Sequence, residues 1–266
     1  MSAPERAPGA ATLTRSRPGA VGFRFTDRSH GDLAVDPRGR GAATEERRRR
    51  SLVDVPWTWL RQVHGARVVT VTAAGEHAGA EADAAVTDVP GALLSVRTAD
   101  CGPLVLEADG AVGVAHVGWR GLVAGVVQAT VDAMAALGRT PTSAVLGPCI
   151  EAHHYEFGAE ALDQVAARFG DAVRGTTGTG SPALDLPAGV AAACEAAGVA
   201  FHHEACCTAC SDVHWSHRAR ADRGRQALVA WVATEPVPGG SLDLPVRSTA
   251  PTLDRSTSDR GTEGVG

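Results

Sequence analysis

The sequence predicts an α/β protein of the α+β type that folds as a single domain. Short apolar or β-branched runs of strand length alternate with amphipathic helical patterns between residues 21 and 232. Two of these apolar runs flank Asp109-Gly110, a dipeptide typical of hairpin turns, so at least one strand pair is antiparallel. A chain of 266 residues, 44% of them hydrophobic, can bury a sizeable core without a second domain.

The first part of the chain alternates between strand patterns and one charged helix. Residues 21–25 show the alternation of a half-buried strand. Residues 45–53 predict a solvent-facing helix, because two glutamates precede four arginines and an apolar pair follows; four arginines in a row can also bind phosphate. A β-branched strand is expected at 68–72, and segment 82–87 leads into an apolar strand that ends at Cys101.

The middle of the chain, from Arg97 to Leu122, concentrates reactive side chains. A strand pair around the Asp-Gly turn would bring Cys101 and His116 towards one end of a sheet. Gly118-Trp119-Arg120-Gly121 then leads into one helix over 122–137, where apolar residues recur on one face and Gly138 ends the pattern. A helix start rich in glycine leaves backbone N–H groups free, which suits an anion.

The last part of the chain continues the alternation. Residues 144–150 predict a strand that enters a tight turn, and 159–169 predict a helix with one apolar face. Pro187 opens a further helix that runs to Gly198. A short strand at 199–201 and a final strand at 227–232 complete the expected elements.

Residues 20–233 are expected to form the folded catalytic domain. We expect 1–19 to be a disordered N-terminal arm and 234–266 a disordered C-terminal tail, because both are rich in Pro, Gly and polar residues and show no periodicity. No apolar run is long enough to span a bilayer, and the N-terminus has no apolar signal core. The expectation is a cytoplasmic protein without membrane contact, whose six cysteines are mostly reduced.

Composition excludes several classes of function. A net charge of −5 and a pI near 6.0 give no general affinity for nucleic acid. All 25 basic residues are arginine, so Schiff-base chemistry, pyridoxal phosphate and a Walker-type phosphate loop, which need a lysine amine, are excluded. The partners to expect are small molecules; the sequence says nothing of protein partners.

Three dispersed residues form the first candidate site. His64 precedes the strand expected at 68–72, and Cys101 and His116 flank the hairpin. Two imidazoles and a thiolate with a fourth position open are a ligand set that catalytic zinc uses. The same residues also support a Cys101–His116 nucleophilic pair, and the spacing alone leaves both interpretations open.

A second candidate site is the compact cluster Cys207-Thr208-Ala209-Cys210. A Cys-x-x-Cys pair indicates structural zinc when a second ligand pair is at hand, and the neighbouring His202 and His203 are the candidates for that pair, with Cys206 beside them. The alternative is a turn of small residues with one or two buried thiols. Both interpretations stay open.

Several motifs occur together and in order between residues 21 and 232. They are Gln62-Val63-His64-Gly65, Ala82-Asp83-Ala84 with Thr87, Thr98-Ala99-Asp100-Cys101, Ala115-His116-Val117-Gly118-Trp119-Arg120-Gly121, Gly147-Pro148-Cys149-Ile150, and Cys207-Thr208 with Ser216 and Arg218. In this the chain resembles the YfiH-like family of laccase-domain proteins, also called the polyphenol oxidase or purine nucleoside phosphorylase family. The Asp-Cys and His-x-Gly-Trp-Arg-Gly motifs are the most specific part of the match.

The resemblance implies a layered α/β/β/α fold with mixed sheets, the CNF1/YfiH-like arrangement. It implies a metal held by His64, Cys101 and His116, zinc being expected and copper the alternative ion. The implied activity is phosphorolysis of adenosine, inosine and methylthioadenosine to base and sugar 1-phosphate, with adenosine deamination alongside. Cys101, His116 and Asp100 are the expected catalytic residues, with Asp100 acting through its neighbours.

Phosphate and nucleoside are therefore the expected ligands. Arg28, Arg120 and Arg218 are candidates for binding phosphate, because a guanidinium offers a bidentate fork to oxyanions. Oxidase chemistry is disfavoured: the chain has no His-x-His pair, and its methionines are Met1 and Met134 alone.

Two family motifs are altered. The N-terminal glycine-rich motif is replaced by Ser29-His30-Gly31, and the usual Phe-Ser-Tyr-Arg-Arg is replaced by Trp215-Ser216-His217-Arg218-Ala219. His30, His214 and His217 are candidate replacements for the lost groups. Two alternatives to the phosphorylase follow: a metal-free Cys/His hydrolase or amidase acting on a cell-wall precursor, and a binding protein that has lost turnover.

Overall fold

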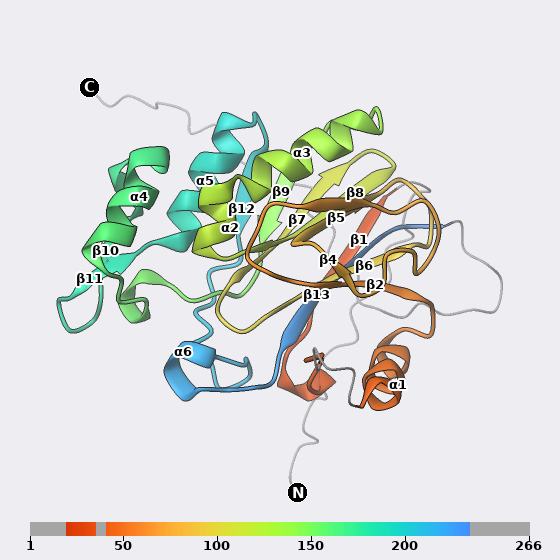
Figure 1. Ribbon diagram of the computed structural model, residues 1–266, viewed down its shortest axis with the longest axis horizontal. Helices are drawn as coiled ribbons and strands as arrows, with labels where there is room; N and C mark the ends of the chain where they lie inside the picture. The colour runs from red at the N-terminus through yellow and green to blue at the C-terminus, as the bar shows by residue number, and fades with distance from the viewer. Residues whose placement is uncertain (1–19, 36–40, 235–266) are drawn as a thin grey trace, which may run out of the picture.

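Two β-sheets stack face to face, and helices cover their outer faces (Figure 1). The computed structural model describes residues 20–35 and 41–234. The arm expected at 1–19 and the tail expected at 234–266 lie outside the described residues, apart from Thr234. Within the described residues, none of the helices has both the length and the apolar character needed to cross a bilayer.

The first sheet has five strands and is mixed. In sheet order they are β1 (Val21–Phe25), β13 (Gln226–Val232), β6 (Leu93–Thr98), β2 (Trp57–Arg61) and β4 (Ala80–Glu81). β13 pairs antiparallel with both β1 and β6, whereas β6, β2 and β4 run parallel. Strands from the two ends of the chain thus lie side by side in this sheet.

The second sheet has six strands and is also mixed. In sheet order they are β12 (Ala200–His203), β9 (Ser143–Leu146), β7 (Gly102–Ala108), β8 (Ala111–Val117), β5 (Ala84–Thr87) and β3 (Val68–Thr70). The central β7–β8 hairpin turns at Asp109-Gly110, as expected, and places Pro103 opposite His116. A separate two-stranded ribbon joins β10 (Arg174–Thr176) to β11 (Pro182–Leu184).

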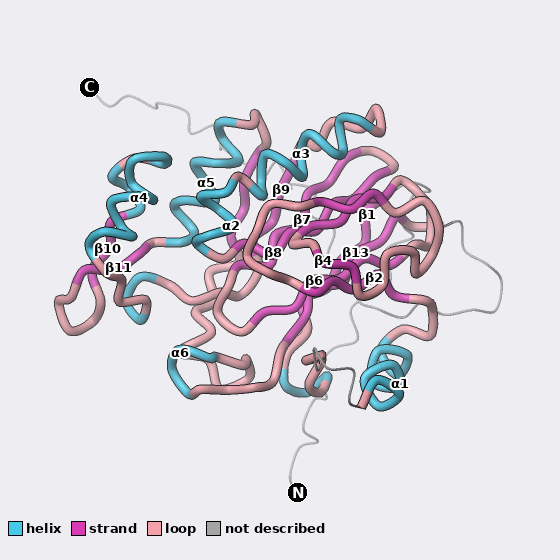
Figure 2. Tube along the Cα trace, in the orientation of Figure 1, coloured by secondary structure: helices cyan, strands magenta, loops and turns pink. Residues whose placement is uncertain are grey.

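Helices lie outside both sheets (Figure 2). The helices on the side of the six-stranded sheet are α2 (Trp119–Ala124), α3 (Val126–Ala136), α4 (Ala159–Phe169) and α5 (Leu186–Ala196). α1 (Ala42–Leu52) lies beside the five-stranded sheet, and α6 (His217–Arg220) follows a C-terminal loop. Three 3-10 turns are η1 (Arg28–His30), η2 (Ala152–His154) and η3 (Asp171–Val173). This arrangement confirms the predicted α/β/β/α layering.

Three layers of buried side chains match these elements. One lies between the six-stranded sheet and its helices, one between the two sheets, and one between the five-stranded sheet and the α1 region. Strand β8 serves the first two layers, because successive side chains point to opposite faces. Val112 and Val114 pack between the sheets. His116 shares their face at the end of the strand, which places its imidazole where the inter-sheet layer meets the exterior.

Two expected elements differ from the structure. The single helix expected over 122–137 is two helices, because Gly125 adopts a left-handed backbone conformation with φ 92° and breaks the run between α2 and α3. The strand expected to end at Cys101 ends at Thr98 and belongs to the five-stranded sheet. Cys101 therefore lies on the short link by which the chain crosses from one sheet to the other.

Candidate metal centre and its cavity

His64, Cys101 and His116 converge at the edge of the inter-sheet layer. Their donor atoms all lie within 4.8 Å of one another. The Cys101 Sγ is 3.8 Å from the His64 Nε2, and the two imidazole rings meet edge to face with centroids 4.8 Å apart. His64 follows β2, Cys101 links β6 to β7, and His116 belongs to β8. Both sheets thus contribute to the trio.

The buried carboxylate of Asp83 holds two of the three ligands. It accepts hydrogen bonds from the backbone N–H groups of His64 and Gly65 at 2.9 and 2.7 Å, and from that of Val63 at 3.2 Å. It also accepts a hydrogen bond from the His116 Nδ1 at 2.8 Å. This bond leaves Nε2 as the nitrogen available to a metal, which would bind the neutral form of the ring, as in carboxylate–histidine–metal relays. Sequence reasoning missed this role, although Asp83 lies in a matching motif.

The charges of the centre support one another. Burial would raise the pKa of the Cys101 thiol, but the His116 imidazolium and the hydrogen bonds with His116 and His64 lower it overall. Burial would lower the pKa of His116, but the Cys101 thiolate and the Asp83 carboxylate raise it. Asp83 is itself held below its usual pKa, because His116 and the backbone N–H groups outweigh the effect of its burial. The thiolate is the form that binds a metal or attacks an electrophile.

Two residues of the centre adopt an uncommon backbone conformation. His64 has φ 61° and Asp100 has φ 102°, values that non-glycine residues adopt only where the surroundings hold them. The Asp83 carboxylate holds His64. Both oxygens of Asp100 are engaged, by the Thr208 hydroxyl at 2.7 Å and the Arg218 N–H at 2.6 Å. Asp100 thereby positions the link that carries Cys101.

Gly118 closes the back of the centre. A Cβ built on Gly118 would meet the Cδ2 of His64 at 2.7 Å and the Sγ of Cys101 at 3.2 Å. The first distance is closer than real Cβ contacts, so the glycine leaves the room that the imidazole and the thiol occupy. Steric exclusion of a Cβ therefore explains why the His-x-Gly motif has a glycine at this position.

The donor set fits a transition metal. Two neutral imidazoles and a thiolate suit zinc and copper, and three protein ligands leave a fourth position, as in catalytic zinc sites. The buried Asp83 supplies the outer carboxylate that commonly orients such a histidine. The residues present therefore fit the metal that the resemblance implies.

A cavity of about 790 Å³ opens over the three ligands. This volume is in the range of small-molecule sites. Six arginines line it: Arg49, Arg61, Arg97, Arg218, Arg223 and Arg225. The acidic residues of its wall are Glu45 and Asp100. The Asp100 carboxylate already accepts hydrogen bonds from Thr208 and Arg218. Arg49 and Arg61 pair with Glu46 and Glu81, but the other four arginines still outnumber the acidic residues of the wall, which suits an anionic ligand.

Arg97 is the arginine whose position is most unusual. Burial, together with the positive charges of Arg49 and Arg225, lowers its pKa to about 10. Its guanidinium donates to the Leu60 carbonyl, but its Nε is buried and without a hydrogen-bond partner. A half-buried guanidinium beside like charges, with its buried Nε unused, is a position that an anion would stabilise. Sequence reasoning did not single out Arg97.

The three arginines chosen from the sequence lie in different places. Arg218 lines the cavity, where its guanidinium stacks over the Tyr155 ring at 4.9 Å and donates to the Glu156 carbonyl. Arg28 pairs with Asp222 at 2.6 Å and stacks over the Trp215 ring, outside the cavity lining. Arg120 is exposed, and its guanidinium stacks over the ring of the preceding Trp119.

Of the three candidate replacement histidines in and near the altered motifs, one lines the cavity. His217, the first residue of α6, lines the cavity. His30 instead pairs with Asp27 at 2.7 Å, and the Nδ1 of His214 lies 2.8 Å from the Ser211 hydroxyl. His217 is thus the replacement histidine that faces the candidate site.

The second candidate site lies apart from the cavity lining. Cys207 and Cys210 do come together, but His202 and His203 are not beside them. His202 is exposed, and the Nε2 of His203 lies 4.0 Å from the Sγ of Cys149. The imidazoles next to Cys207 and Cys210 are those of His153 and His154.

Comparison with known proteins identifies the family of the chain. The family model described as multi-copper polyphenol oxidoreductase laccase matches residues 25–233. The proteins named purine nucleoside phosphorylase ORF3 of Streptomyces griseus and SCO2081 of Streptomyces coelicolor are each 40% identical to the chain. The match to the first protein spans 80% of this chain and 95% of that protein. The match to the second spans 79% of this chain and 95% of that protein.

Solved structures show the same fold. The Neisseria meningitidis protein NMB0706 superposes with a TM-score of 0.70 at 28% identity, covering 84% of this chain and 99% of its own. YlmD from Geobacillus stearothermophilus gives a TM-score of 0.67 at 25% identity, covering 81% and 93%. The described domain therefore shares its fold with nearly the whole length of each of these two proteins.

Proposed function

The chain belongs to the multi-copper polyphenol oxidoreductase laccase family, and on that premise we propose that it is a zinc-dependent purine nucleoside phosphorylase. Relatives that share about two fifths of its residues carry the name purine nucleoside phosphorylase. The proposed reaction takes adenosine, inosine or methylthioadenosine and phosphate to the free base and a sugar 1-phosphate, with adenosine deamination as a side activity. The observation that carries the proposal is the His64/Cys101/His116 trio at the wall of an arginine-lined cavity.

Zinc held by His64, Cys101 and His116 would supply Lewis acidity toward an oxygen nucleophile. Asp83 keeps His116 in the tautomer that a ligand needs and fixes the backbone of His64. Asp100 holds the link bearing Cys101 through Thr208 and Arg218, so we assign it a positioning role.

The arginines bind and orient the phosphate. Arg97 offers its unused Nε, and Arg218 and Arg225 bring further guanidinium groups to the same cavity. Holding the phosphate beside the sugar lowers the entropic part of the activation barrier. The guanidinium groups also replace the water that solvates the phosphate charge. In the reaction, a phosphate oxygen forms a bond to the anomeric carbon while the bond to the purine nitrogen breaks. His217 is the cavity imidazole outside the trio that can give a proton to the departing base.

The test is metal content and turnover in wild type and Cys101→Ala, measured side by side. We expect the wild type to release base from adenosine and inosine only when phosphate is present, and to form inosine from adenosine without phosphate. Cys101→Ala should lose one bound zinc and both activities. Cys194→Ala, which changes a buried thiol in α5, serves as the matched control and should keep all three. Turnover that survives in Cys101→Ala would overturn the mechanism.

One observation favours a second candidate. The Cys101 thiolate, the His116 imidazolium and the Asp83 carboxylate lie in the order that cysteine hydrolases use for nucleophile, base and orienting acid. A hydrolase or amidase acting on a cell-wall precursor would keep its activity after removal of zinc and lose it on alkylation of Cys101. The phosphorylase would lose activity on removal of zinc and need phosphate for turnover.

A further inference from the structure

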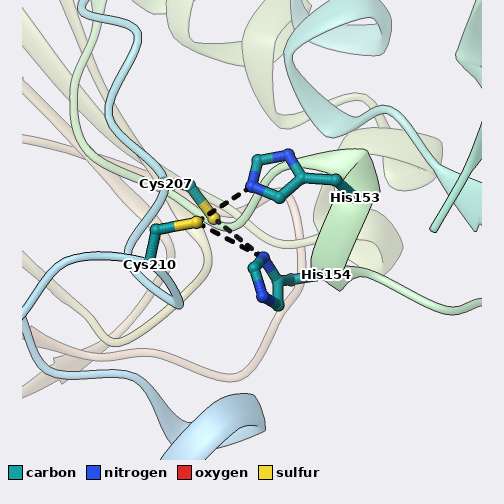
Figure 3. Close-up of side chains that lie close together, drawn as sticks. All are labelled: His153, His154, Cys207 and Cys210. Atoms are coloured by element: carbon teal, nitrogen blue, oxygen red, sulfur yellow. Dashed lines mark hydrogen bonds between the residues drawn. The ribbon is translucent and has the colours of Figure 1, made fainter. Parts of the chain in front are cut away.

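A second group of metal-binding side chains lies outside the cavity (Figure 3). It consists of His153, His154, Cys207 and Cys210, whose donor atoms all lie within 4.8 Å of one another. The Nε2 of His153 is 3.0 Å from the Cys210 Sγ, and the Nδ1 of His154 is 3.5 Å from the same sulfur. The Cys207 Sγ lies 3.9 Å from the His154 Nδ1. In Figure 3 the two rings and the two sulfurs point toward a common centre.

The backbone fixes both halves of this group. The imidazoles come from η2, and the thiols come from the loop after β12. A parallel bridge joins Cys149 to Cys207, with the Cys149 N–H donating to the Cys206 carbonyl and the Thr208 N–H donating to the Cys149 carbonyl. Arg220 donates to the Thr208 and Ala209 carbonyls inside the Cys-x-x-Cys turn. The four ligands therefore sit on two loops already held together.

We propose that His153, His154, Cys207 and Cys210 bind a structural zinc ion. Two thiolates and two imidazoles in a closed tetrahedral set are the ligands of structural zinc sites. Zinc–sulfur and zinc–nitrogen bonds of about 2.3 and 2.0–2.1 Å would place the donors roughly 3.3–3.8 Å apart. The three separations given above, 3.0, 3.5 and 3.9 Å, bracket that range. The site completes itself within one chain.

The surroundings favour a metal over packed thiols. Cys207 is buried, but His153, His154 and Cys210 are exposed, so apolar packing does not explain why they converge. A Glu151 carboxylate oxygen lies 3.7 Å from the Nδ1 of His153, behind the nitrogen that faces Cys210. This distance is too long for a hydrogen bond, but it places a negative charge beside the ring, which favours a cation at the opposite nitrogen. A Cys207–Cys210 disulfide would use neither imidazole.

The zinc would brace the loop that holds Asp100. Thr208 lies inside the Cys-x-x-Cys turn, and its hydroxyl donates to the Asp100 carboxylate. The Ile150 N–H, one residue before Glu151, donates to the Asp100 carbonyl. Both ligand-bearing loops thus contact the residue next to Cys101. The proposal stands on its own geometry and holds whether or not the chain is a phosphorylase.

The test counts metal ions in protein purified with reductant under nitrogen. Wild type should carry two zinc ions per chain, and Cys210→Ser and His153→Ala should each carry one. The controls are Cys206→Ser and His202→Ala, a neighbouring thiol and an exposed histidine outside the group, which should both keep two. Equal zinc in Cys210→Ser and Cys206→Ser would overturn the proposal.

A second measurement covers the case in which Cys210→Ser does not fold. Cys101→Ala leaves this group intact, so it should retain one zinc. After zinc is replaced by cobalt, it should show the intense visible bands of tetrahedral cobalt and a thiolate charge-transfer band. Cys101→Ala without bound metal, or a Cys207–Cys210 disulfide in the peptide map, would contradict the proposal. A third outcome is one zinc ion in wild type that is kept by Cys101→Ala and lost by Cys210→Ser. This result would support the structural zinc site and contradict the zinc-dependent phosphorylase.

Discussion

Asp83 shows how one buried side chain organises a site assembled from distant segments. Its carboxylate has no access to solvent, yet its oxygens accept three backbone N–H groups and one imidazole. A buried charge is tolerated when it is hydrogen-bonded on all sides. The same contacts give His64 its left-handed backbone and His116 its tautomer. The protein's own hydrogen bonds thus position two of the three ligands.

Gly118 provides the sharpest test of this preorganisation. In Gly118→Ala, the new Cβ would lie 2.7 Å from the His64 ring, so the imidazole or the backbone must move. Because the φ of −84° suits alanine, the fold should persist while zinc affinity falls about 10–100-fold. A competition titration with a chromophoric chelator, made in a Cys210→Ser background so that one centre reports, measures the change.

The control for Gly118 is another glycine that precedes a helix. Gly158 has φ −67° and ψ 142°, close to the −84° and 163° of Gly118, and a Cβ there meets nothing within 4 Å. Gly158→Ala should bind zinc as the parent does. Equal affinities in the two alanine variants would show that the close contact does not matter.

The site could be predicted from the sequence only in part. His64, Cys101 and His116 follow from motifs that resemble a family, whereas their spacing of 37 and 15 positions does not bring them together. The roles of Arg97 and Asp83 were missed because they depend on burial and on partners from other strands. His153 and His154 were missed because adjacent histidines in a 3-10 turn show no periodicity that points to Cys207.

Among the elements, prediction succeeded where the side-chain pattern alone decides the structure. The 159–169 pattern predicts α4 with its observed bounds, since one apolar face needs no distant partner. The run at 122–137 has the same apolar pattern, but Gly125 interrupts it with a backbone conformation that no pattern reveals. Trp57–Arg61 was not recognised as a strand because its pairing with β6 and β4, not its own alternation, makes it one.

Asp222, in the loop that follows α6, forms an ion pair with Arg28 near the start of the described chain, and the strength of this contact depends on pH. Its carboxylate accepts hydrogen bonds from Arg28, from the Ser216 N–H and from Arg220. Burial raises the pKa of Asp222, but these hydrogen bonds and the charges of Arg28 and Arg220 lower it below its ordinary 3.8. A lowered pKa in the folded state stabilises the protein above pH 3.8, and that stabilisation is lost as the pH falls through the folded value.

We therefore expect Asp222→Asn to be less stable than wild type at pH 7, and the difference to shrink on acidification below pH 3.8. Urea unfolding of both proteins between pH 7 and pH 3 measures it. Asp171→Asn is the control, because the Asp171 carboxylate is 90% exposed and its pair with Arg174 lies in solvent, where ion pairs contribute little to stability. A difference for Asp222→Asn that stays constant or grows towards pH 3 would contradict the assignment.

At the scale of the whole molecule, the sequence predicts the fold class, with sheets covered by helices, but not which strands pair or in which register. Alternating apolar residues predict which strands are buried. The partner of each strand depends on contacts between distant segments, such as β1 with β13. The fold then brings the ends of β2 and β6 from one sheet to the end of β8 from the other. The metal centre lies at this junction, so a bound ion would join the sheets at an edge where packing ends.

Zinc should therefore stabilise the entire domain through the first centre. A ligand that binds only the folded state at about 100 times its Kd adds about 2.7 kcal/mol to the free energy of unfolding. For a domain of this size that is roughly 5–10 °C in Tm. We expect this rise when zinc is added to metal-free Cys210→Ser protein, in which the trio is intact. Cys101→Ala/Cys210→Ser should show almost none, because it lacks the Sγ that joins the β6–β7 link to the two histidines. Calorimetry of both proteins with and without zinc decides the matter, and an equal rise in the double variant would mean that zinc binds elsewhere and does not join the sheets.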